Sequence, residues 1–143
     1  MTEGAITEDG GEKLVGVVVV SHSGEVAESV ARLATALAGG GTAPVRAAGG
    51  TPDGGFGTSE ELIREAAYAV DQGAGVAILV DLGSAVLTVK ALLAEEDELP
   101  EGSRLVDAPL VEGAVAAVVT ASTGADVDTV AGAAAEAYDY RKV

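Results

Sequence analysis

Two continuous apolar runs most constrain what this chain can fold into. They are LVGVVVV at residues 14–20 and VAILV at residues 76–80. Unbroken rather than alternating hydrophobicity is typical of strands that are buried on both faces, as in a parallel sheet. A short polar turn follows each run, and the spacing of apolar residues then changes to that of a helix. The pattern therefore predicts an α/β fold.

Two weaker strands are predicted at residues 44–48 and 104–106, and helical spacing returns after each strand. A last, alanine-rich helix is predicted from about residue 126 to 138. The chain should thus form an open, mostly parallel four-stranded sheet with helices on both faces. One helix face is formed by Val26, Val30, Leu33 and Leu37. Two predicted inward stripes are Leu62, Ile63, Ala66 and Val70; and Val111, Val115, Val118 and Val119.

Helix starts are also marked in the sequence. Thr58 with Glu61 three residues later has the spacing of a capping box. Ser84 is a candidate cap for a helix that places Leu87 and Ala91 on one face. Residues 1–12 are polar and acidic, which predicts a disordered tail before a single domain at residues 13–143.

Composition excludes several classes of function. The 143 residues contain no cysteine, which rules out disulfides, thiolate metal sites and a cysteine nucleophile. A formal charge of −15 opposes binding to nucleic acid or to an anionic membrane. The start of the chain lacks the features of a signal peptide, and no apolar run approaches the roughly 20 residues of a membrane span. A cytoplasmic protein is expected.

The acidic surface carries few lysines, only Lys13, Lys90 and Lys142. Such a surface suits solution at high salt, where repulsion between like charges is screened, and so favours a halophilic protein. Ordinary acidic solubility is the alternative. Neither interpretation assigns a biochemical role.

Three polar segments follow the first three predicted strands and should meet at one edge of the sheet. The first contains His22, the only histidine in the chain. A neutral imidazole is an available nucleophile near neutral pH, and a helix start directly behind it favours a phosphoryl group. The alternative is a histidine that packs or caps locally. The position after a buried strand favours the chemical role.

Asp81 ends the strand at residues 76–80 and could accept a hydrogen bond from one imidazole nitrogen, which would leave the other nitrogen as the nucleophile. It could instead cap a local helix start. Ser23 and Ser84 are candidate donors to a phosphoryl group, although Ser84 also suits a cap. The glycine-rich loop at 49–57 could form an anion nest or a flexible lid. Its first three residues, Gly49, Gly50 and Thr51, are the candidate phosphoryl ligands there.

Other chemistries fit less well. One histidine with scattered carboxylates falls short of a metal site, so no metal is expected. The segment SHSG at residues 21–24 is not the nucleophile elbow of a hydrolase. No P-loop or dinucleotide fingerprint is present, and aromatic residues to stack a flavin are nearly absent. A receiver domain that phosphorylates Asp81 would need an acidic pair where His22 stands. A phosphate-carrying histidine is the best match.

Four segments in order give the chain a family resemblance. They are VVVVSHS at residues 17–23, GGTPDGGFGTS at 49–59, LVDLGSA at 79–85 and DAPLVEGA at 107–114. Together they resemble the mannose-type enzyme IIA family of the phosphotransferase system. The fourth segment points to the branch that serves phosphoenolpyruvate-dependent dihydroxyacetone kinases. The resemblance implies a flavodoxin-like fold, a homodimer, a phosphohistidine at His22 and support from Asp81.

The resemblance also implies a relay between proteins. A small histidine phosphocarrier, HPr, would phosphorylate His22, which would pass the group to ADP on the DhaL subunit. The ATP formed there would phosphorylate dihydroxyacetone on the DhaK subunit, so this chain itself would bind no cofactor. Two alternatives are a regulatory module switched by phosphorylation of His22 and a mannose-type IIA domain in sugar transport.

Overall fold

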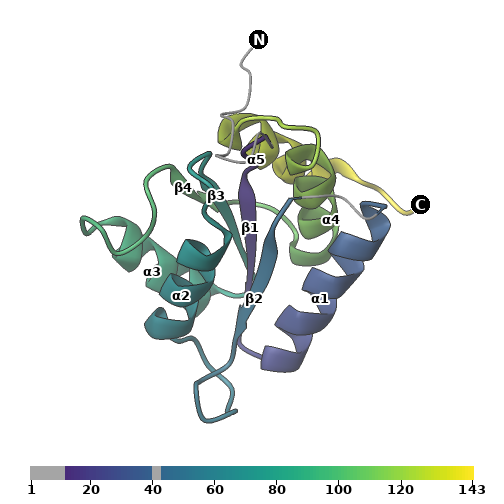
Figure 1. Cartoon of the computed structure of the whole chain (residues 1–143). Helices are drawn as coiled ribbons and strands as arrows, with labels where there is room; N and C mark the ends of the chain where they lie inside the picture. The colour runs from purple at the N-terminus through teal and green to yellow at the C-terminus, as the bar shows by residue number, and fades with distance from the viewer. Residues whose placement is uncertain (1–11, 40–42) are drawn as a thin grey trace.

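The computed structural model describes residues 12–39 and 43–143, and four parallel strands form its sheet in the order β2-β1-β3-β4. The helices and strands alternate along the chain, as the sequence predicts (Figure 1). The strands are β1 (Gly16–Ser21), β2 (Val45–Gly49), β3 (Val76–Val80) and β4 (Ser103–Val106). The helices are α1 (Gly24–Leu37), α2 (Glu60–Val70), α3 (Gly83–Leu93), α4 (Leu110–Ala121), α5 (Val127–Ala135) and the 3₁₀ helix η1 (Glu136–Asp139).

Strands β1 and β3 lie at the centre of the sheet, and every residue in them is buried. Odd and even positions of β1 point to opposite faces, so Val17 and Val19 enter one core and Val18 and Val20 the other. Helices α1, α4 and α5 cover the first face, and α2 and α3 cover the second (Figure 1). The predicted α/β class and two-sided helical cover are confirmed.

The predicted acidic tail at residues 1–12 lies outside the described residues, apart from Glu12. Among the helices of the described chain, none combines the length and the apolar character needed to cross a membrane.

The helix predicted around Val26, Val30, Leu33 and Leu37 is confirmed as α1, but most of this apolar face points away from the sheet. Val26, Leu33 and Leu37 are exposed, by 45%, 42% and 61%, and only Val30 of the four is buried. The other residues that face the sheet are alanines: Ala27, Ala31 and Ala34. Small side chains let the helix approach the sheet closely, so the alanine stripe packs inward and the larger stripe faces away.

The same reversal occurs in α4. Val118 is buried as predicted, but Val111 and Val119 are exposed and Val115 is only half-buried. The residues that pack inward are Gly113, Ala114, Ala117, Val118 and Ala121. Helices α1 and α4 lie side by side (Figure 1), and residues of their outward stripes line the same hollow. We call the surface formed by Leu33, Leu37, Val111, Val119 and Tyr140 the α1–α4 apolar patch; it borders a hollow of about 590 Å³.

The α2 stripe is largely as predicted, since Ile63, Ala66 and Val70 are buried. The cap of α2 differs by one residue. Ser59, not Thr58, is the N-cap, and its hydroxyl accepts a hydrogen bond from the amide of Leu62 at 3.1 Å. The predicted capping box is therefore wrong, because one more extended residue precedes the helix.

Helix α3 also begins differently from the prediction. Its N-cap is Leu82, which makes no side-chain capping bond, and Ser84 lies inside the first turn. Leu87 and Ala91 face solvent, whereas Ala85, Val89 and Leu92 pack against the sheet. Ser84 is thus released from capping, and its hydroxyl is directed elsewhere.

Candidate active site

The four strands end at the same edge of the sheet, and the candidate residues of two of them meet there. Strands β1 and β3 are hydrogen-bonded neighbours whose last registered pair is Val20 and Val80. The next residues on β1 are Ser21 and His22, and the next on β3 is Asp81. The parallel register therefore brings His22 beside Asp81, although 59 positions separate them in the chain.

The imidazole of His22 contacts the carboxylate of Asp81 directly. Nδ1 lies 2.9 Å from Oδ1 of Asp81. An ionised carboxylate only accepts hydrogen bonds, so the ring proton of neutral His22 belongs on Nδ1. The lone pair is then on Nε2, which is the nitrogen that faces away from Asp81. The pair can thus supply an oriented nitrogen nucleophile.

Asp81 accepts four hydrogen bonds, two on each oxygen. Oδ1 accepts from Nδ1 of His22 and from the amide of Leu82 at 2.7 Å. Oδ2 accepts from the amide of His22 and from the hydroxyl of Ser21, both at 2.9 Å. Burial alone would raise the pKa of Asp81, but these bonds outweigh it and hold the pKa below the ordinary value of 3.8. Asp81 is therefore a carboxylate at neutral pH.

Ser84 completes the ring's contacts on the opposite side. Its hydroxyl oxygen is within hydrogen-bonding distance of Nε2 of His22. With the ring proton on Nδ1, Ser84 donates and Nε2 accepts. Ser84 belongs to the first turn of α3, a helix whose start has no side-chain cap. The positive end of α3 consequently adjoins the nucleophilic nitrogen.

Ser23, predicted as a phosphoryl ligand, is the N-cap of α1. Its hydroxyl accepts from the amide of Val26 at 3.2 Å. This bond uses a lone pair and leaves the hydroxyl proton free to donate.

The sequence pattern assigns no role to Ser21, yet this residue is only 2% exposed and its hydroxyl makes two hydrogen bonds within the site. Besides donating to Asp81, its hydroxyl accepts from the amide of Ser23 at 3.0 Å. The signal in the sequence is a hydroxyl at the end of a strand that is otherwise wholly apolar.

The glycine-rich loop holds the backbone around His22 from both ends. The amide of Gly50 donates to the carbonyl of Ser21 at 3.1 Å, and the amide of Gly57 donates to the carbonyl of His22 at 2.9 Å. Gly49 packs so closely on α1 that an added Cβ would lie 2.5 Å from the carbonyl oxygen of Ser23. While these contacts are in place, the amide of Gly50 is not available to a phosphoryl oxygen.

Thr51, another predicted ligand, is engaged inside the same loop. Its hydroxyl donates to Oδ1 of Asp53 and accepts from the amide of Gly55 at 2.9 Å. The bond from Thr51 is the main reason that the pKa of Asp53 lies below its ordinary value. The loop therefore closes on itself through Thr51.

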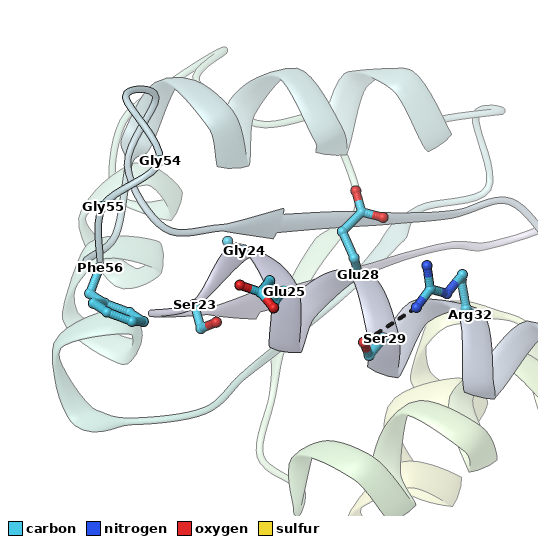
Figure 2. Close-up of a pocket in the computed structure, with 10 residues that line it drawn as sticks. Ser23, Gly24, Glu25, Glu28, Ser29, Arg32, Gly54, Gly55 and Phe56 are labelled. Atoms are coloured by element: carbon cyan, nitrogen blue, oxygen red, sulfur yellow. Dashed lines mark hydrogen bonds between the residues drawn. The ribbon is translucent and has the colours of Figure 1, made fainter.

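A cavity of about 550 Å³ lies beside the site, between α1 and the loop (Figure 2). Figure 2 shows Gly54, Gly55 and Phe56 of the loop facing the first turn of α1. Glu25 and Glu28 line the cavity, and Arg32 is the cation at its far end. Two carboxylates oppose an anion here, so the phosphoryl position is better sought at Nε2 of His22.

Over the described parts of the chain, no cluster of three or more histidine, aspartate or glutamate side chains is placed to hold a metal ion. The fourth segment of the family resemblance starts at Asp107, directly after β4. Its carboxylate accepts from the hydroxyl of Tyr138 at 2.6 Å, which ties η1 to this edge of the sheet.

Comparisons with known proteins identify the family to which this chain belongs. The sequence model of the EIIA-man family, described as "PTS system fructose IIA component", matches residues 16–131. The chain is 40% identical over 120 residues to the "PEP-dependent dihydroxyacetone kinase, phosphoryl donor subunit DhaM" of Pantoea ananatis, and 37% identical over 120 residues to its counterpart in Escherichia coli. These alignments cover 82% of this chain but 25% of each relative, so the chain spans about a quarter of their length.

A shorter relative is matched over most of its length. It is the "PEP-dependent dihydroxyacetone kinase 2, phosphoryl donor subunit DhaM" of Listeria innocua, 35% identical over 107 residues, or 74% of this chain and 85% of the relative. A crystal structure of a protein of unknown function, EF1359, has a TM-score of 0.72 and 29% identity, covering 86% of this chain and 94% of that one. The chain belongs to the EIIA-man family and, within it, to the DhaM subunits.

Proposed function

We propose that His22 accepts a phosphoryl group on Nε2 and passes it on, as the phosphoryl donor subunit of a phosphoenolpyruvate-dependent dihydroxyacetone kinase. The observation that carries this proposal is the bond between Nδ1 of His22 and the carboxylate of Asp81. This bond favours the proton on Nδ1, so that the lone pair of Nε2 can attack once the hydroxyl of Ser84 turns away. The names of the matched relatives supply the kinase system and its substrate class.

Phosphoryl acceptance needs no proton transfer in this arrangement. The lone pair of Nε2 attacks the phosphorus of a donor phosphohistidine in line, and the donor's N–P bond breaks with its electron pair returning to the donor imidazole. His22 becomes a phosphorylated imidazolium, and its Nδ1–H stays bonded to Asp81. The carboxylate stabilises the positive charge that develops on the ring.

Donation reverses these steps on a different acceptor. A terminal phosphate oxygen of ADP attacks the phosphorus, the Nε2–P bond breaks, and the electron pair returns to Nε2. The ring is neutral again, with its proton still on Nδ1. The reaction therefore depends on positioning and charge stabilisation, as phosphoryl transfer does in general.

Ser84 changes partner during the cycle. In the unphosphorylated chain its hydroxyl donates to Nε2, where the new bond must form. On transfer the hydroxyl turns to a phosphoryl oxygen, while the start of α3 favours the dianion. Ser23 donates its free hydroxyl proton from the start of α1. Gly49, Gly50 and Thr51 act indirectly, by holding the loop that clamps the backbone of His22.

The relay assigned to this chain is cytoplasmic. An HPr-like phosphocarrier supplies the phosphoryl group, and ADP on DhaL receives it. DhaK holds the dihydroxyacetone, so this chain needs no cofactor of its own. Residues 13–143 act as one phosphotransfer domain, and the charge of −15 on the whole chain suits high salt.

Intact mass spectrometry tests the central claim. Wild-type chain and His22→Ala are incubated with phosphoenolpyruvate, enzyme I and HPr, at low and at high salt. We expect one acid-labile phosphoryl group on the wild type and none on the variant. A labelled His22→Ala, or an unlabelled wild type with active HPr, would remove His22 from the proposal. ATP formed on addition of ADP-loaded DhaL supports the kinase role, and transfer to a IIB protein instead would indicate sugar transport.

We also propose that two copies of the chain associate through the α1–α4 apolar patch. A chain of charge −15 repels its own copy except where a face carries few charges. The patch meets this condition, because only two of the residues that line its hollow are charged, Glu112 and Glu136, and Glu112 is paired with Lys142 at 3.0 Å. Sedimentation should show a dimer for the wild type and a monomer for Leu37→Glu combined with Val119→Glu. A wild-type monomer at assay concentration would contradict the dimer.

A further inference from the structure

We propose that Ser21 is a positioning residue, whose hydroxyl holds the carboxylate of Asp81 so that Oδ1 faces Nδ1 of His22. This inference rests on the proposed function of His22 and adds a residue through which that function is arranged. Ser21 itself does not reach the ring. It acts through Asp81.

The hydroxyl of Ser21 has one direction available for its proton. Its oxygen accepts from the amide of Ser23 at 3.0 Å, so one lone pair is engaged there. The proton is directed to Oδ2 of Asp81, 2.9 Å away. The side chain is 2% exposed, so water does not compete for either bond.

To keep a fixed orientation toward His22, the carboxylate of Asp81 needs a hydrogen bond that anchors each of its oxygens. Rotation about χ2 of an aspartate is soft, and a small rotation would take Oδ1 out of line with Nδ1. Ser21 and the amide of His22 hold Oδ2, while the amide of Leu82 supports Oδ1. Of these three anchors, Ser21 is the only side chain. It is therefore the anchor that substitution can remove without changing the reacting groups.

A purely structural role for Ser21 predicts a different outcome. If it only satisfies the amide of Ser23 at the start of α1, its loss should lower stability and leave the ring of His22 unchanged. Ser59 provides a control, because its hydroxyl also accepts from a backbone amide at a helix start, that of Leu62 at 3.1 Å, and makes no hydrogen bond to Asp81 in the described part of the chain. Loss of such a cap costs about 1 kcal/mol of stability.

The test compares Ser21→Ala, Ser21→Cys, Ser21→Thr and Ser59→Ala with the wild type in two measurements. The first is ¹⁵N NMR of the imidazole, which reports the tautomer without any phosphoryl donor. The second is the initial rate of phosphoryl acceptance from HPr. For Ser21→Ala we expect a mixture of tautomers and about a tenfold lower rate, since one hydrogen bond to a charged group is lost.

The other variants separate positioning from folding. Ser21→Thr retains the hydroxyl and should restore the single Nδ1–H tautomer and most of the rate. Ser21→Cys has nearly the same size with a weak donor and should behave like Ser21→Ala, which covers the case in which alanine fails to fold. Ser59→Ala should lower stability only. Unchanged tautomer and rate in the folded Ser21→Ala or Ser21→Cys variant would overturn the inference.

Failure of the proposed function gives a different result. A wild type that takes no phosphoryl group would refute the carrier role of His22, whereas the tautomer measurement would still decide whether Ser21 orients the pair.

Discussion

Two regions at the same edge of the sheet illustrate different ways of building a site. The cluster of Ser21, His22 and Asp81 joins two strands by side-chain bonds that cross the fold. The glycine-rich loop at residues 49–57 closes on itself, with Thr51 bonded to Asp53 and Gly55. The first region is buried at Ser21, and the second is open, with Phe56 86% exposed.

In the proposed function, this difference separates the residues that would perform the chemistry from the residues that hold them in place. The cross-strand cluster has its hydrogen-bond partners in place before any ligand arrives, so its geometry is preorganised. The loop reaches the cluster only through its backbone, at the carbonyls of Ser21 and His22. Substitutions in the cluster should therefore change rates, and substitutions in the loop should change stability first.

The largest effect in this comparison is expected for Asp81→Asn. In Asp81→Asn, an NH₂ group replaces one carboxylate oxygen, which accepts two hydrogen bonds in the wild type. The NH₂ group, itself a donor, then faces the two donors that bound this oxygen. We expect phosphoryl acceptance to slow by about 10- to 100-fold, the range for a lost hydrogen bond to a charged group. Stopped-flow or quench measurement of the initial rate checks this. Asp126→Asn, at the cap of α5, is the charge-matched control and should keep the wild-type rate, because the adjacent Val127 packs near Gly75 at the start of β3, the end of the strand opposite Asp81. Equal rates in both variants would remove Asp81 from the mechanism.

A pair of glycine substitutions tests the loop. Gly50 has φ of +68° and an added Cβ would lie 2.5 Å from the carbonyl oxygen of Gly55. Gly54 also has a positive φ, +90°, but its added Cβ would meet nothing within 4 Å. We expect Gly50→Ala to lower the free energy of unfolding by about 2–3 kcal/mol and Gly54→Ala by about 1 kcal/mol. Urea unfolding followed by circular dichroism measures both. Equal losses of unfolding free energy in the two variants would mean that the loop backbone shifts to accommodate a side chain at position 50 without cost.

Acid titration measures the anchoring of Asp81 directly. Its pKa is lowered in the folded chain relative to 3.8, so the unfolded chain binds this proton more readily. The stabilisation is therefore complete above the unfolded pKa and is lost as pH falls through the folded value. The difference in unfolding free energy between wild type and Asp81→Asn should be constant from about pH 7 to 5 and should shrink below about pH 4. A difference that grows on acidification would contradict the lowered pKa.

The smallest effect is expected for Thr51→Val. The substitution removes the bonds to Asp53 and Gly55 but leaves the His22 cluster intact. We expect a loss of about 1 kcal/mol in stability and a rate of phosphoryl acceptance within about twofold of wild type. A tenfold loss of rate at unchanged stability would show that Thr51 binds the phosphoryl group, as the sequence pattern predicts.

Much of this edge could be predicted from the sequence. Residues 17–20 and 76–80 are short, continuously apolar and rich in β-branched side chains, which favours buried strands, and strands of a parallel sheet end on the same side. The positions of His22 and Asp81 follow from that rule. Ser21 could not be assigned in the same way, because a serine at a strand end does not reveal what its hydroxyl contacts.

Helix periodicity does not indicate which face of a helix packs against the sheet. It identifies the apolar stripe with Leu33 and Leu37 on α1, but the face with Ala31 and Ala34 has the same period. Which face meets the sheet depends on how closely the helix can approach, and alanine allows the closer approach. The larger side chains are left on the surface that we propose as the dimer contact.

The sequence by itself determined how strands and helices alternate along the chain, the acidic surface and the two residues at the centre of the candidate site. These depend on local composition, on periodicity and on the chirality of parallel connections. Only the tertiary structure decided which helix stripe is buried, that Ser84 faces Nε2, and that Asp81 is held by four donors. Apart from the adjacent amide of Leu82, the hydrogen bonds of the site join residues about 60 positions apart. Their geometry depends on the distances between packed elements, which a linear pattern does not contain.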